Sequence, residues 1–155
     1  MQALLGAQEG LGTFHAHKDQ SSVLPNSQGK AFGEKIQTRV VTLDGVIKEL
    51  HFPWPDLIKL DLQGYELECL KGGFQALSGA QAVIAEANFF RFQGGQPLFT
   101  DVVAFMERSG YRLYDILNLW VRPLDGALAQ GDFLFLRKDH PLCNDNRWSN
   151  SSAFS

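Results

Sequence analysis

The sequence predicts an α/β fold with a mostly parallel sheet that ends in an antiparallel strand. Two segments with helical spacing of apolar residues, 65–77 and 98–109, each follow a β-prone segment. Residues 82–88 (AVIAEAN) are almost continuously apolar, as in a strand that is covered on both faces. Two β-prone segments, 111–117 and 132–137, come last. This order of strand, helix, strand, helix, strand, strand is typical of α/β domains.

The residues before this regular part predict short strands, a loop and one short helix. An apolar strand, a glycine turn and a second strand near 12–17 open the chain. Residues 18–35 are rich in polar residues and predict a surface loop, and 36–43 are β-prone. Residues 43–52 predict a short helix capped by Asp44, which Pro53 and Pro55 end.

From residue 57 onward each element has a clear pattern. Residues 57–62 predict a strand, and 65–77 predict one helix whose apolar face carries Leu67, Leu70, Phe74 and Leu77. The next helix has a stripe of Leu98, Val102 and Met106 and ends at Gly110. The turn-rich residues 118–131 are expected to connect the last two strands. The chain thus predicts one domain over 1–140 and a polar, disordered tail over 141–155.

Composition excludes several classes of protein. The 155 residues carry a formal net charge of −3, which gives no electrostatic reason to expect nucleic acid or an anionic membrane as partner. The two cysteines, Cys69 and Cys143, support neither a disulfide framework nor a zinc site. No signal peptide or membrane-spanning run is visible, so we expect a cytoplasmic protein.

The strand at 57–62 carries two opposite charges, Lys59 and Asp61, on one face. An edge strand can expose such a pair to water, whereas a central strand has to desolvate it at a cost of several kcal/mol per ion. Asp61 comes at the carboxyl end of the strand, where open α/β sheets bind ligands. Gly64 and Glu66 follow at the turn and the first helical turn, and Glu86 ends the next strand. These residues predict a site, and an ion pair with helix capping is the alternative.

The stretch DLIKLDLQGYELECLKGG, residues 56–73, followed by an apolar strand ending in Glu86, resembles the FkbM-type methyltransferase family. The upstream TRVVTLDGVI, the opening ALLGAQEGLGTFHAH and the later SGYRLYDI and GDFLFLRK are similar as well. The likeness covers about residues 3–140. It implies a Rossmann-like sheet and an S-adenosylmethionine-dependent enzyme that methylates a hydroxyl group on a small molecule or glycan.

The resemblance begins only at the third strand of that sheet, so it implies a partial domain. In the family's fold a glycine-rich turn after the first strand and an acidic residue after the second hold the cofactor. Neither has a counterpart in this chain. The stretch GAQEGLG at 6–12 has the wrong spacing for GxGxxG and joins two β-prone segments. The resemblance therefore does not imply that this chain binds S-adenosylmethionine alone.

By position, the resemblance implies roles for particular residues. Asp61 would orient or deprotonate the acceptor hydroxyl, Lys59 would keep it ionised, and Glu86 would complete the catalytic group. The residues expected on the cofactor side are Ser21, Ser22, Asp44, Gly64 and Glu66. The alternative function is a non-catalytic binding or assembly domain. In either case an open edge at 57–62 predicts a homo-oligomer.

Three other groups of residues have simpler explanations. His15, His17 and Asp19 have the spacing of metal ligands on one strand face but are expected on the solvent side of a hairpin, so no metal is predicted. Cys69 is expected in the core. The phenylalanines of NFFRFQGGQP, residues 88–97, either cover the sheet edge or line an acceptor pocket.

Overall fold

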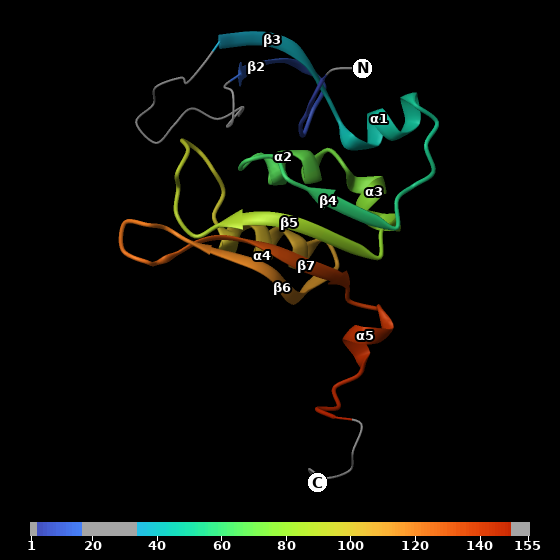
Figure 1. Ribbon diagram of the computed structural model, residues 1–155. Helices are drawn as coiled ribbons and strands as arrows, with labels where there is room; N and C mark the ends of the chain where they lie inside the picture. The colour runs from blue at the N-terminus through green and yellow to red at the C-terminus, as the bar shows by residue number, and fades with distance from the viewer. Residues whose placement is uncertain (1–2, 17–33, 150–155) are drawn as a thin grey trace.

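The chain forms two sheets, one from its first part and one from the rest (Figure 1). This computed structural model describes residues 3–16 and 34–149. The first sheet is three-stranded, in the order β1 (Leu4–Leu5), β3 (Glu34–Val41), β2 (Gly10–Ala16). β1 is parallel and β2 antiparallel to β3. The β-prone segments predicted here are confirmed as strands.

The second sheet is four-stranded and holds the candidate site. Its order is β4 (Leu57–Leu60), β5 (Ala82–Asn88), β7 (Leu128–Arg137), β6 (Tyr111–Val121). β4 and β5 are parallel, and β7 is antiparallel to both of its neighbours. The α/β class and the antiparallel final strand are confirmed, but the expectation of a mostly parallel sheet was wrong for the strand pairings, because only β4 and β5 pair in parallel and the other two pairings are antiparallel. The final strand lies between β5 and β6, which the chain order alone does not indicate.

The last two strands form a long hairpin, so the predicted connection over 118–131 was wrong. β6 continues to Val121 and β7 begins at Leu128. The register shifts after Leu113, Ile116 and Trp120, which marks bulges in β6. Because β6 is an edge strand with mostly exposed side chains, it lacks the apolar alternation that would have predicted its length.

The helix predicted over 65–77 is two helices, α2 (Glu66–Lys71) and α3 (Phe74–Gly79). The break falls at Gly72 and Gly73. A Cβ on Gly72 would lie 2.1 Å from the carbonyl oxygen of Gly6, so only glycine permits this close approach. The break also changes the predicted apolar face, since Leu70 and Leu77 are buried but Phe74 is 77% exposed.

The helix predicted over 43–52 is α1 (Leu43–Glu49), but its predicted cap was wrong. Thr42 caps α1 by accepting from the Gly45 N–H. The Asp44 carboxylate instead accepts from the N–H groups of Gln75 (2.8 Å) and Ala76 (2.9 Å), in the first turn of α3. Asp44 therefore joins α1 to α3 across more than thirty residues of sequence.

One face of the four-stranded sheet is covered by helices. The inward residues of β4, β5 and β7 share one core with α2, α3 and α4 (Phe99–Arg108), whose Val102 and Met106 are buried as predicted. Among these core residues are Ile58, Leu60, Val83, Ala85, Phe133, Phe135, Leu70 and Leu77. The opposite face carries no helix from the described part of the chain. We call it the open face.

The predicted tail begins with one helical turn, α5 (Pro141–Asn144), which buries Cys143. Arg112 of β6 donates to the Cys143 carbonyl at 3.1 Å, so this turn is attached to the sheet. Within residues 3–16 and 34–149, no helix has the length and apolarity needed to cross a membrane.

Candidate functional site

The position of β4 in its sheet decides whether Lys59 and Asp61 are exposed to water or desolvated. β4 is an edge strand of its sheet, and the side chains of Lys59 and Asp61 are exposed. They form no ion pair with each other in the described structure; Asp61 accepts instead from the Gln63 side chain at 3.1 Å. The two charges are thus solvated at the sheet edge and need no desolvation.

A tight turn carries the chain from β4 to α2. Gln63 and Gly64 have positive φ values of 52° and 94°, and such strain in a non-glycine residue is common beside functional sites. Glu66, only 1% exposed, holds the turn by accepting from the N–H groups of Leu62 (2.8 Å) and Gly64 (3.2 Å). Burial raises the pKa of the Glu66 carboxyl, and these backbone donors oppose the rise.

Four polar side chains form a row across the open face at this end of the sheet. β4 pairs Leu60 with Ala85, so Asp61 lies beside Glu86 where the two strands continue. Glu86 pairs with Asp132 on β7, and Asp132 pairs with Asn118 on β6. The Asn118 amide donates to the Asp132 carboxylate at 3.0 Å. We call Asp61, Glu86, Asp132 and Asn118 the acidic row.

Glu86 is the most perturbed carboxyl group of this row. Its side chain is 7% exposed and accepts from the Gln130 amide at 3.1 Å. Burial first, and then the nearby carboxylates of Glu66, Asp61 and Asp132, raise the pKa of Glu86 to about 7, while Lys59 lowers it. Glu86 can therefore gain or release a proton near neutral pH, as a general base requires.

A second buried polar side chain lies next to Glu86. Asn88 is two residues further along β5, on the same face, and 2% exposed. Its backbone pairs with Gln130, but its carboxamide makes no hydrogen bond to another described residue. Because buried amides are almost always hydrogen-bonded, a bound ligand is a reasonable partner for this group.

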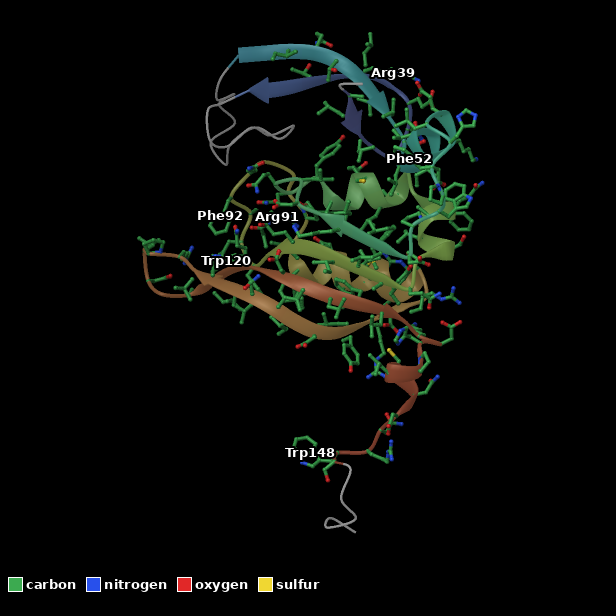
Figure 2. All side chains as sticks on the ribbon, turned by 45° about the vertical axis from the view of Figure 1, so that its right-hand side comes forward. Arg39, Phe52, Arg91, Phe92, Trp120 and Trp148 are labelled. Carbon is green, nitrogen blue, oxygen red and sulfur yellow. The ribbon has the colours of Figure 1, made fainter. Side chains whose placement is uncertain are left out.

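The loop 89–98 borders the site at the same end of the sheet. Figure 2 shows Arg91 and Phe92 of this loop near Trp120 of β6. The buried Gln96 holds the loop closed, since its side chain accepts from the N–H groups of Phe92 and Gln93 and its carbonyl accepts from Arg91. Gln96 also packs on Gly64, where a Cβ would lie 2.7 Å from the Gln96 amide nitrogen.

Between this loop and α2 lies a pocket of about 230 Å³. Gly64 and Tyr65 form one side of it, and Arg91 and Asp101, whose charged groups are 3.7 Å apart, form the other. The phenylalanines of the loop do not line this pocket but contact neighbouring side chains. Phe89 stacks on Phe99 at 5.0 Å, whereas Phe90 lies under the Arg122 guanidinium at 3.9 Å.

The remaining predicted residues are placed elsewhere or lie outside the described residues. Both oxygens of Asp44 are used in capping α3. Ser21 and Ser22 fall outside the described ranges, as do His17 and Asp19 of the considered metal set. No group of metal-ligating side chains occurs in the part of the chain that the structure describes. Cys69 is fully buried, and burial raises the pKa of its thiol to about 12.

Asp132, Asn118 and Gln130 were not predicted as site residues. All three belong to the hairpin of β6 and β7. They lie close to Glu86 because β7 pairs directly with β5 and stands between β5 and β6. Of these three residues, only Asp132 could have been suspected from the sequence, because it is a charged residue at the start of an otherwise apolar segment.

The four-stranded sheet and the acidic row together describe an α/β protein whose acidic side chains gather on one face, toward the carboxyl ends of β4 and β5. The family model described as methyltransferase FkbM domain matches residues 3–113, more than half of the chain. The chain belongs to this family of methyltransferases, which confirms the resemblance seen in the sequence. The match ends within β6. Comparison with curated proteins and with solved structures gave no match.

Proposed function

We propose that the chain provides the methyl-acceptor side of an S-adenosylmethionine-dependent O-methyltransferase. The observation that carries this proposal is the acidic row with Glu86 at its centre. The order of the four strands also supports it, because the resemblance implies that they are the fourth strand onward of a Rossmann-like sheet, which forms one side of the cofactor cleft.

The chemistry of the acidic row fits the reacting end of this cofactor. S-adenosylmethionine, when bound, supplies a methyl group on a positively charged sulfonium and departs as a neutral thioether. Carboxylates of Asp61 and Asp132 attract such a cation. No residue within 3–16 and 34–149 is placed to hold the ribose or the methionine moiety, so the proposal concerns the methyl and acceptor end alone.

Two carboxylates divide the work on the acceptor. Asp61, exposed at the edge of β4, accepts a hydrogen bond from the acceptor hydroxyl and orients it. Glu86, with a pKa of about 7, takes the hydroxyl proton as the oxygen forms its bond to the methyl carbon. Lys59 opposes the accumulated negative charge and keeps a fraction of Glu86 ionised at neutral pH.

Calorimetric titration with S-adenosylmethionine and S-adenosylhomocysteine tests this proposal. Saturable binding that is tighter for the positively charged S-adenosylmethionine than for S-adenosylhomocysteine would support it. In Asp61→Asn the difference between the two affinities should be smaller. Asp61 is exposed, so this variant should keep the fold. A folded chain that binds neither compound would contradict methyl transfer by this chain and favour the alternative, a non-catalytic binding or assembly domain of the family.

A further inference from the structure

A groove of about 430 Å³ lies on the helical side of the sheet, away from the acidic row. Leu70 and Leu77 of α2 and α3 form one wall, and Phe105 of α4 forms the other. Its volume is in the range of small-molecule sites, about 300–1,000 Å³. None of these residues contributes to the proposed methyl-transfer site.

The groove lies beside the break between α2 and α3, and residues of both helices line it. Gly72 allows the contact with Gly6, and Gly73 allows contact with Leu43, whose side chain would lie 2.8 Å from a Cβ there. Asp44 then fixes the start of α3. As a result Phe74, which would join the core in a continuous helix, stands 77% exposed at the groove. Phe74 thus adds an exposed apolar ring to a groove that Leu70, Leu77 and Phe105 also line, and such a concave apolar lining is typical of small-molecule sites.

The charges beside the groove are both positive, although the protein as a whole is acidic. Lys71 and Arg108 line it, on α2 and in the last turn of α4. Lys71 pairs with Glu68. Arg108 has no hydrogen bond or ion pair with any other residue that the structure describes, so its guanidinium is available to a ligand.

We propose that this groove binds a single-chain anionic amphiphile, a medium-chain carboxylate, with the alkyl chain between Phe74 and Phe105 and the carboxylate on Arg108. The guanidinium fork matches a carboxylate with two parallel hydrogen bonds. A second protein is a poorer occupant, because a stable protein interface takes about 20–30 residues from each partner, whereas eight residues line this groove.

Calorimetric titration of the full chain with decanoate below its micelle concentration tests the proposal. Decyltrimethylammonium, which has the same alkyl chain and the opposite charge, serves as the control ligand. We expect saturable binding of one decanoate, with much weaker binding of the cation. Arg108→Gln should weaken decanoate binding about threefold, and Phe74→Ala about tenfold.

Two control variants each remove an arginine or a phenylalanine that does not line the groove. Arg39 is exposed and paired with Glu49, and Phe52 is 59% exposed; Figure 2 shows both near α1. Arg39→Gln and Phe52→Ala should leave the affinity unchanged. Because Phe74 and Arg108 are exposed, their variants should fold, which circular dichroism checks.

Four results would overturn the proposal. The first is the absence of saturable decanoate binding by the folded chain. The second is an affinity that neither Phe74→Ala nor Arg108→Gln lowers, and the third is equal affinity for the cation. The fourth is self-association that Phe74→Ala abolishes, since the groove would then hold a second copy of the chain. Titration with S-adenosylmethionine is independent of these four results, so failure of one proposal is distinguishable from failure of the other.

Discussion

Glu86 shows how the environment of one residue sets its chemistry. A carboxyl group on an exposed strand would ionise at its ordinary pKa of 4.5, but here burial and three neighbouring carboxylates raise the pKa of Glu86 to about 7. The sequence predicted Glu86 and Asp61 as neighbours, because parallel strands end at one edge of a sheet. It did not predict Asp132, whose contribution depends on a contact between β5 and β7 that lie far apart in the chain.

The raised pKa of Glu86 predicts how stability depends on pH. The unfolded chain releases this proton near pH 4.5 and the folded chain near 7, so between these values the folded state holds a proton that the unfolded state lacks. Raising the pH through this window should therefore lower the free energy of unfolding by on the order of 1–3 kcal/mol. Urea unfolding at pH 5 and pH 8 measures this change. Glu86→Gln should remove this part of the pH dependence, and an unchanged pH dependence in that variant would contradict the assignment.

Asp44 predicts a second effect at the scale of a residue. Asp44→Ala removes the acceptor for two N–H groups in the first turn of α3 and should lower the free energy of unfolding by about 1–2 kcal/mol. Asp56→Ala, a change of another aspartate that caps no helix, should change it by less than about 0.5 kcal/mol. Equal effects of the two substitutions in urea unfolding would show that the Asp44 cap contributes nothing.

At the scale of elements, the junction of α2 and α3 departs clearly from the sequence prediction, which expected one continuous helix. The apolar spacing continues without interruption from Leu70 to Leu77, so periodicity predicts one helix. Two consecutive glycines were the available signal for a break. What decides the break is tertiary, since the backbone of Gly6 occupies the space that a side chain at residue 72 would need.

Substitution of two glycines tests this explanation. Gly72→Ala should lower the free energy of unfolding by at least about 2 kcal/mol, because the added Cβ would lie 2.1 Å from the Gly6 carbonyl oxygen. Gly79→Ala, at the end of α3, adds a Cβ in ordinary contact, 3.8 Å from Trp54, and should change it by less than about 1 kcal/mol. Thermal unfolding of both variants gives the comparison. A tolerated alanine at residue 72 would mean that the contact with Gly6 does not set the break.

At the scale of the whole molecule, the four-stranded sheet has one covered face and one open face. The predictable part was the order of elements and the core of β4, β5 and α4, because each has its own apolar period. The position of β7 between β5 and β6, and hence half of the acidic row, was not predictable, because strand order depends on pairings between distant segments.

The open edge of β4 predicts reversible self-association. No strand from the described residues pairs with its outer side, and Leu57 on this strand is 53% exposed. In sedimentation velocity, the average sedimentation coefficient should rise with protein concentration. Leu57→Lys should lower it toward the value of the monomer. Leu142→Lys, at a similarly exposed leucine on α5, should have no effect. A wild-type monomer at every concentration would contradict the prediction.

The carboxylates of Asp61, Glu86 and Asp132 form one electrostatically coupled site on the open face. The most direct test is an NMR titration of the Glu86 carboxyl carbon, assigned with Glu86→Gln. We predict a midpoint near pH 7 that falls in Asp61→Asn, because a neighbouring negative charge is removed, and rises in Lys59→Met, because a positive charge is removed. A midpoint near pH 4.5, unaffected by either substitution, would contradict the account.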